Sequence, residues 1–275
     1  MIKILSPAQT NILLFLARYK FLTTSQLLTL GVSKRRSNLS VMLKPLKESK
    51  RPFIGEMEFA FVPSKGRLEN FYYLKPKGKK LLLDSGIVGE EDIRIPKGRT
   101  VMFTQDYFHR KYTIDCHIAC DISAKKYGIQ ILGFDRYFDK TGNNRTRKNL
   151  QAKTKLEIAN DYLIADATLL VAHGQTSRLF ALELYNDTNT KRITDQIFKH
   201  IQGIRESSLC KNYNIQKGHR LLAVFTHPEV IAHVKNRLGT TGFDDFLLFN
   251  DYASVTNDFF GEWESLSKKS VRIQE

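Results

Sequence analysis

Residues 164–184 have the sequence IADATLLVAHGQTSRLFALEL. Two apolar runs flank the cluster HGQT at residues 173–176, and this pattern predicts two β-strands joined by a turn. The strand-like runs extend over residues 162–172 and 178–184. Because the turn lies about midway between Asp166 and Glu183, we expect the hairpin to place these two acids roughly opposite one another.

The two acids are unusual because each lies within apolar strand sequence. An ionised carboxylate inside a sheet is costly unless it is paired or bound to a cation. Two carboxylates at this spacing suit Mg²⁺ or Mn²⁺, and Glu157 is a further acid that could complete the metal shell or simply lie at the surface. The alternative is a pair of strand-end acids with ion pairs to Arg178 or Lys191.

The surrounding sequence alternates between helix and strand patterns. Helices are predicted for residues 104–127, 190–207 and 228–238, and further strands for residues 129–134, 220–226 and 246–249. This alternation predicts a mixed α/β core about four strands wide.

A basic stretch precedes the hairpin. Residues 140–155 contain six Lys or Arg and no acid, together with a glycine and three asparagines, which predicts an exposed loop. Arg145, Arg147 and Lys148 would clamp DNA there through their charge, with a strong dependence on salt. A solvated loop without a ligand is the alternative interpretation.

The N-terminal region has a different pattern. Three short helices are predicted, the first at residues 7–18 with Ser6 as N-cap, the second at residues 25–30 with Thr24 as N-cap, and the third at residues 33–50. Two β-rich runs follow at residues 53–62 and 68–74, separated by the turn-forming PSKG at 63–66. Three helices followed by a hairpin are typical of a winged helix.

The third helix of this region begins with basic and short polar residues, which suits a helix that reads the major groove. The predicted DNA-binding residues of this helix are Lys34, Arg35, Arg36, Ser37 and Asn38. Lys65 and Arg67 lie in the predicted wing, and a third basic stretch covers residues 75–80. A protein-binding winged helix is the alternative, and Pro45 is expected to kink or shorten the third helix.

The charge distribution supports this division. The chain has 43 Lys and Arg against 28 Asp and Glu, a net charge of +15, and residues 1–83 carry +12 of it. A strongly basic segment beside a nearly balanced body predicts a polyanion-binding module joined to a second domain. The predicted limits are residues 1–84 for the winged helix, 85–102 for a linker and 103–275 for the α/β domain, which makes the fold class α+β.

Several other classes are excluded by the sequence. No apolar run approaches the length of a membrane span, no secretory signal is evident, and three cysteines in 275 residues suit a reducing cytoplasm, where we expect the protein to act. No two histidines are two residues apart, and neither a phosphate-binding Gly-Lys-Ser/Thr loop nor a covalent hydrolase signature is present.

The order Asp166, Glu183 and then a helix rich in Lys and Arg resembles the PD-(D/E)XK nuclease core. With the N-terminal winged helix, the chain resembles the replication-relaxation family and the C-type mobilisation relaxases of plasmids, and residues 180–188 (FALELYNDT) carry most of the resemblance. The resemblance implies Mg²⁺- or Mn²⁺-dependent nicking of double-stranded DNA at an origin-type site, with other mobilisation or replication proteins as partners. It also implies that Asp166, Glu183 and the Leu184 carbonyl hold the metal.

The sequence departs from this family at one catalytic position, because Tyr185 stands where the nuclease pattern has a lysine. That lysine stabilises charge on the phosphate. Lys191 and Lys199 in the following helix are the candidates to replace it, with Lys191 ranked first, whereas Arg192 could supply charge but not a base. The rival hypothesis is a non-catalytic DNA-binding initiator or regulator with a degenerate nuclease fold.

Overall fold

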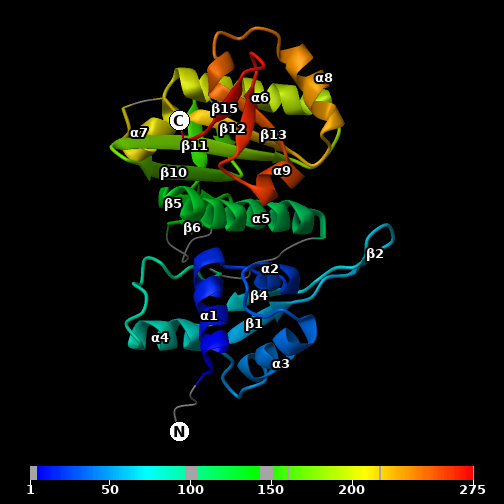
Figure 1. The fold of residues 1–275 in the computed structure, drawn as a ribbon, viewed down its shortest axis with the longest axis vertical. Coiled ribbons are helices and arrows are strands. Elements are labelled where there is room, and N and C mark those ends of the chain that lie inside the picture. Colours follow the sequence, from blue (N-terminus) through cyan, green and yellow to red (C-terminus); the bar gives the residue numbers. More distant parts are fainter. Residues whose placement is uncertain (1–4, 97–103, 143–150, 160, 217, 275) are drawn as a thin grey trace. The chain divides into compact units, whose positions relative to one another are not determined.

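The computed structural model describes residues 5–96, 104–142, 151–159, 161–216 and 218–274 (Figure 1). The chain is an α+β protein, with N-terminal helices followed by a seven-stranded mixed sheet and its helices. It divides into two compact units, residues 1–114 and 115–275, and the division falls inside helix α5 (Thr104–Tyr127). The domain limits inferred from composition stay a prediction.

The first two helices begin at well-formed caps. Helix α1 (Pro7–Tyr19) has Ser6 as N-cap, and Ser6 and Gln9 exchange hydrogen bonds between side chain and backbone at 3.1 and 3.3 Å. Helix α2 (Thr24–Thr29) has the same arrangement one residue earlier than predicted, because Thr23 is the N-cap and exchanges hydrogen bonds with Gln26.

Helix α3 (Arg36–Lys47) is shorter than the predicted span of 33–50. Its start is delayed because the Ser33 hydroxyl accepts a hydrogen bond from the Arg35 amide at 3.2 Å, which holds these residues in a turn before the helix. Pro45 lies within the last turn, and the helix ends two residues after it.

The predicted hairpin after α3 is confirmed. Strand β1 (Ile54–Met57) pairs antiparallel with β4 (Phe71–Leu74), and the chain between them forms a second short pair, β2 (Phe61–Val62) with β3 (Gly66–Arg67). Helix α4 (Pro76–Asp84) follows β4. The positive φ of Gly66, +76°, explains why a glycine ends the tight turn between β2 and β3.

The second unit is built on a sheet of seven strands, which is wider than the predicted four. Its strands are, in spatial order, β15 (Ser270–Arg272), β14 (Glu262–Ser265), β13 (Leu247–Asp251), β12 (Arg220–Phe225), β11 (Thr176–Tyr185), β10 (Ala167–His173) and β5 (Gln130–Arg136). The three central strands β11, β12 and β13 are parallel, and the others pair antiparallel. Residues 221–225 are all buried, as expected for a central parallel strand covered on both faces.

Helices cover both faces of this sheet (Figure 1). On one face lie α6 (Thr190–Arg205) and α8 (Glu229–Leu238), whose apolar side chains, Ile193 and Ile197 among them, share one core with alternate residues of β11 and β12. On the other face lies the C-terminal part of α5, where the His117 ring stacks on Phe134 of β5 with 3.9 Å between centroids. The sheet is therefore the middle of three layers.

Smaller elements complete this unit. They are β6 (Lys140–Thr141), β7 (Gln151–Ala152), β8 (Lys155–Ile158), β9 (Asp161–Ile164), α7 (Ser208–Tyr213), a 3₁₀ turn (Asp244–Phe246) and α9 (Tyr252–Asn257). The predicted strand 162–172 is split, because β9 pairs with β8 outside the main sheet. The described part of the basic stretch 140–155 is strand rather than loop at its two ends. Within the described residues, no helix is long and apolar enough to cross a membrane.

Candidate functional site

The hairpin β10–β11 brings Asp166 and Glu183 together. Ala167 pairs with Leu182 across the two strands, so the next positions along each strand, 166 and 183, face one another. The Leu184 amide donates a hydrogen bond to Asp166 Oδ2 at 2.7 Å, which fixes the Asp166 carboxylate against β11. The predicted opposition of the two acids is therefore present in the fold.

Both acids are buried, with exposed fractions of 7% for Asp166 and 2% for Glu183. Burial raises the pKa of the Glu183 carboxyl well above its ordinary value, and the adjacent Asp166 raises this pKa further through its charge and a hydrogen bond between the two side chains. Two carboxylates this close cannot both ionise at low cost. The pair must therefore hold a proton or a cation.

Helix α6 supplies the other polar groups around Glu183. Gln196 donates a hydrogen bond from Nε2 to Glu183 Oε2 at 2.6 Å, and His200 Nε2 lies 2.7 Å from Glu183 Oε1. Neither residue is among those predicted from the sequence. Their spacing of four within the apolar stripe of α6 is the signal that could have identified them, because it places both on the face that packs on the sheet.

A second histidine adjoins this cluster. Burial lowers the pKa of His200 to about 3, with a further contribution from His219, and burial lowers the pKa of His219 to about 4. Both rings are therefore neutral near pH 7. Among the described residues, His200 Nδ1 and both ring nitrogens of His219 are buried without a hydrogen-bond partner.

The predicted lysines lie elsewhere. Lys199 Nζ pairs with Asp161 Oδ2 at 2.6 Å, and Lys191 is exposed in the first turn of α6. Arg192, which also pairs with Asp187, is the cation whose charge lowers the pKa of Glu183. Tyr185, at the position of the family lysine, is 2% exposed, and among the described residues its hydroxyl has no partner.

The donor set of the pair fits a hard divalent cation. Mg²⁺ commonly uses one or two carboxylates and completes its shell with water and substrate phosphate. Asp166 and Glu183 supply the carboxylates, and the Leu184 carbonyl lies on the Asp166 side of β11, because the N–H and C=O of one strand residue point toward the same neighbour. Within the described part of the chain, no group of three His, Cys, Asp or Glu has the arrangement of a metal site. Glu157 stands apart, exposed on β8 and paired with Lys155 at 3.0 Å.

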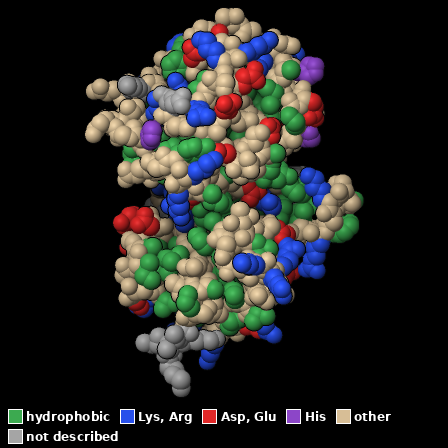
Figure 2. Space-filling model, viewed as in Figure 1, with side chains coloured by type: hydrophobic (Ala, Val, Ile, Leu, Met, Phe, Trp, Pro, Cys, Tyr) green, Lys and Arg blue, Asp and Glu red, His purple; other side chains and the backbone are tan. Residues whose placement is uncertain are grey.

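The residues predicted to bind DNA in the first unit are exposed around the start of α3. Lys34 and Arg35 precede the helix, and Ser37 and Asn38 form its first turn. Arg36, also predicted to bind DNA, pairs through its guanidinium with the Glu69 carboxylate. Figure 2 shows Lys and Arg side chains over the region of α3 and the β2–β3 hairpin.

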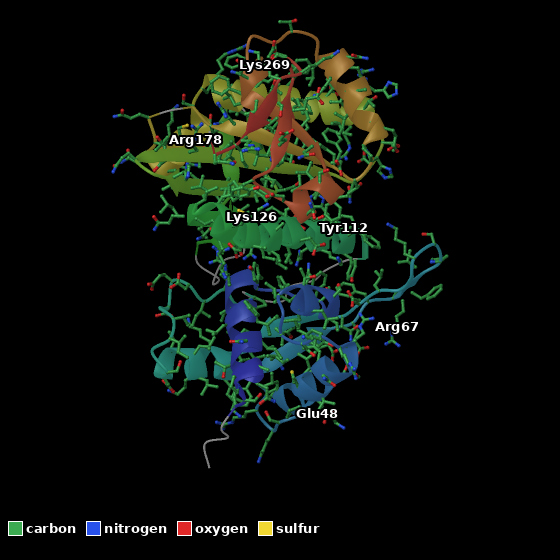
Figure 3. The ribbon with its side chains drawn as sticks, viewed as in Figure 1. Glu48, Arg67, Tyr112, Lys126, Arg178 and Lys269 are labelled. Atoms are coloured by element: carbon green, nitrogen blue, oxygen red, sulfur yellow. The ribbon has the colours of Figure 1, made fainter. Side chains whose placement is uncertain are left out.

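The β2–β3 hairpin presents cations and one aromatic ring. Arg67 is exposed on β3 (Figure 3), and Phe61 on β2 is 67% exposed. The Lys65 ammonium lies over the Phe108 ring, 4.3 Å from its centroid, so it is held by a cation–π contact within the first unit. Arg145, Arg147 and Lys148 lie outside the described residues.

No family model matches the chain, and no curated protein matches it. A solved structure of the restriction endonuclease FokI is similar at 10% sequence identity with a TM-score of 0.29, over 91% of this chain and 42% of that one. The chain thus spans less than half of that enzyme, and a TM-score this low does not establish a shared fold.

Proposed function

We propose that the chain is a DNA-binding protein whose second unit is a PD-(D/E)XK-like, metal-dependent nuclease that nicks DNA. The observation that carries the proposal is the pair of Asp166 and Glu183, buried side by side on adjacent strands and sharing a hydrogen bond. A core position for two carboxylates is costly, and binding a cation offsets that cost. The resemblance to plasmid relaxases makes mobilisation or replication the process.

Asp166 and Glu183 would hold Mg²⁺ or Mn²⁺, with the Leu184 carbonyl as a third ligand. A metal ion bound there would supply Lewis-acid activation of water and of a DNA phosphate. Gln196 and His200 hold the two oxygens of Glu183 at 2.6 and 2.7 Å, so they orient the carboxylate toward Asp166. Neutral His200 is a positioning residue in this proposal.

The electrostatic role of the missing lysine is assigned to the start of α6. Arg192 already lowers the pKa of Glu183 through its charge, and Lys191 is exposed next to it. A guanidinium can stabilise negative charge on a phosphate, but it cannot accept a proton. Lys191 and Lys199 remain the proposed alternatives for this role.

The first unit is proposed to be a winged helix that binds double-stranded DNA. The order of three helices and a hairpin supports this assignment. Exposed residues at the start of α3, from Lys34 to Asn38, would contact the major groove, and Arg67 with Lys65 would contact the phosphate backbone from the hairpin. Both contacts rely on charge, which the +12 of residues 1–83 provides.

A nicking assay tests the nuclease proposal. Supercoiled plasmid carrying a mobilisation origin is incubated with the full chain and Mg²⁺ or Mn²⁺, and open-circular product is measured on a gel. We expect wild type to nick, and Asp166→Asn and Glu183→Gln to lose at least about 100-fold in rate. Glu157→Gln, which changes an exposed acid of the same unit, serves as the matched control. Equal nicking by wild type and both site variants would overturn the proposal.

A second candidate function is a non-catalytic DNA-binding initiator or regulator. One observation favours it: the side chain at the lysine position is Tyr185, which is buried in the core beneath α6 and is no substitute for a phosphate-facing cation. In this case wild type binds plasmid DNA in a gel-shift assay but yields no open circles with either metal. Nicking that depends on Glu183 would exclude this candidate.

A further inference from the structure

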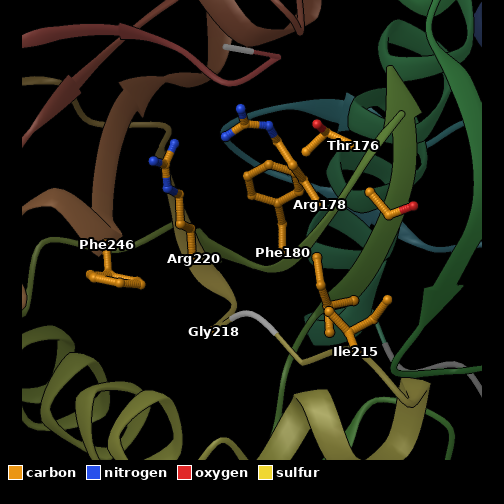
Figure 4. Close-up of a pocket in the computed structure, with 9 residues that line it drawn as sticks. Thr176, Arg178, Phe180, Ile215, Gly218, Arg220 and Phe246 are labelled. Carbon is orange, nitrogen blue, oxygen red and sulfur yellow. The ribbon is translucent and has the colours of Figure 1, made fainter. Parts of the chain in front are cut away.

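The first unit has two strongly exposed apolar side chains. Val41 on α3 is 73% exposed and Phe61 on β2 is 67% exposed, the two highest values among the large hydrophobic residues that the structure describes. The cavity of about 400 Å³ where β11 and β12 begin in the second unit offers less apolar surface (Figure 4), because Leu179 and Phe180 in its lining are buried. Val41 and Phe61 lie on the two elements to which the proposed function assigns DNA contacts.

Val41 lies at the centre of the outward face of α3. Leu39 and Leu43, each two residues from Val41, are buried, so they project from the opposite side of the helix. Ser37 is four residues before Val41 and Lys44 is three residues after it, and both are exposed, so the three side chains lie in one row along the outward face. The middle of this row is therefore apolar, and its two ends are polar and basic.

The sequence around Val41 is strongly basic. Residues 33–47 contain five Lys or Arg and no acid. Two polar neighbours are held by the first unit itself, because the Arg36 guanidinium pairs with the Glu69 carboxylate and the Ser40 hydroxyl donates to the Arg36 carbonyl at 3.2 Å. The outward face of α3 thus carries one apolar group within a positive surface. Such a face complements a polyanion that presents a small apolar group of its own.

Double-stranded DNA has this chemistry. Its major groove admits an α-helix, and the thymine 5-methyl group is the apolar group that a base pair presents there between two rows of phosphates. A protein partner fits less well, because the core of a protein interface is a fully buried apolar patch, whereas Val41 lies in its row between Ser37 and Lys44. We propose that Val41 contacts the 5-methyl group of a thymine and so gives the first unit a preference for that base pair. This inference rests on the proposed binding of α3 in the major groove.

Removal of single methyl groups from the DNA tests the contact. Duplexes with a random central segment are selected for binding to the full wild-type chain, and each thymine of the preferred duplex is then replaced in turn by deoxyuridine, which lacks only the 5-methyl group. We expect one of these replacements to weaken wild-type binding about 3- to 10-fold in fluorescence anisotropy, because burial of one methyl group corresponds to roughly a factor of 4 in affinity. A preferred duplex in which no replacement weakens binding would refute the contact but not the proposed DNA binding. Failure of wild type to bind any duplex would refute both.

Variants connect the thymine methyl group to Val41. We expect Val41→Ala to bind the preferred duplex about 3- to 10-fold more weakly than wild type and to bind the thymine and deoxyuridine duplexes equally, because the side chain that senses the methyl group is shortened. Val41→Thr keeps the branched shape and one methyl group, so it should retain part of the discrimination. Ile87→Ala changes another exposed apolar side chain of the first unit, 56% exposed, and should bind as wild type. Equal sensitivity of wild type and Val41→Ala to deoxyuridine would overturn the proposal. Unchanged DNA affinity of Val41→Ala would also overturn it and is the result expected if this face binds a protein instead.

Discussion

The raised pKa of Glu183 makes a measurement of stability against pH informative. Because the pKa of Glu183 is raised in the folded protein, the folded state retains a proton that the unfolded chain releases above about pH 4.3. The free energy of unfolding therefore falls as the pH rises from about 4.3 toward the raised pKa of Glu183 in the folded protein. The decrease is at most about 1.4 kcal/mol per pH unit for one proton. Glu183→Gln removes this titration, and its amide can still accept from Gln196 and donate to His200.

The expected result is a difference between wild type and Glu183→Gln in the free energy of unfolding plotted against pH. Without metal, we expect Glu183→Gln to gain about 1–3 kcal/mol of stability relative to wild type between about pH 5 and about pH 8. His200 and His219 have lowered pKa values, so they contribute the opposite slope, but they are present in both proteins and largely cancel in the difference. Excess Mg²⁺ should reduce the difference, because a bound cation replaces the shared proton.

The assay uses the protein's single tryptophan. Trp263 is buried in the second unit, so its fluorescence during urea unfolding reports this unit in the presence of the first. Unfolding curves are recorded in EDTA and in Mg²⁺ at several pH values for wild type, Glu183→Gln and the exposed control Glu157→Gln. Parallel pH dependence of wild type and Glu183→Gln in EDTA would refute the reasoning that the pair shares a proton.

Three other predictions concern separate parts of the chain. Gly78→Ala should destabilise the first unit by about 1–3 kcal/mol, because the added Cβ would lie 2.5 Å from the Phe53 carbonyl oxygen. Gly203→Ala in α6 meets only ordinary contacts and should stabilise the second unit by about 0.5–1 kcal/mol. Calorimetric melting measures both changes. Wild type should lose stability as the pH falls below about 6.5, because the pKa of buried His219 is lowered to about 4 in the folded protein. His219→Phe removes this titration, so the variant should keep part of that stability at low pH. Urea unfolding followed by tryptophan fluorescence measures the difference. Arg67→Ala should weaken DNA binding and lower the slope of log affinity against log salt by about 1, measured by fluorescence anisotropy, and an unchanged slope would contradict a phosphate contact.

Local signals in the sequence predicted much of the secondary structure. Helix α5 has the predicted bounds, and the hairpin β10–β11 forms around the predicted turn, because apolar periodicity and turn residues act over a few neighbours. The sheet is wider than predicted because β14 and the edge strand β15 are short strands with alternating burial. β14 pairs with β13 and β15 pairs with β14, so their stability comes from pairing rather than from an apolar run of their own.

The candidate site was predictable only in part. Opposition of Asp166 and Glu183 follows from the turn position, which is a property of the hairpin alone. Which α6 residues face Glu183 depends on the rotation of the helix on the sheet, and this rotation places His200 inward and the neighbouring Lys199 outward. Distance in sequence alone does not give this rotation, and the roles of Lys191 and Lys199 stay a prediction.

The same proton connects the two candidate functions. If the second unit is a nuclease, a divalent cation displaces the proton of Glu183, and the pH dependence in Mg²⁺ departs from that in EDTA. If the unit only supports DNA binding, the proton stays, and Glu183 with Gln196 and His200 is a neutral hydrogen-bond network in the core. The two functions thus predict different stability curves in Mg²⁺ for the wild-type chain. This distinction requires no knowledge of the DNA sequence that the first unit recognises, because both curves depend only on what the buried pair binds.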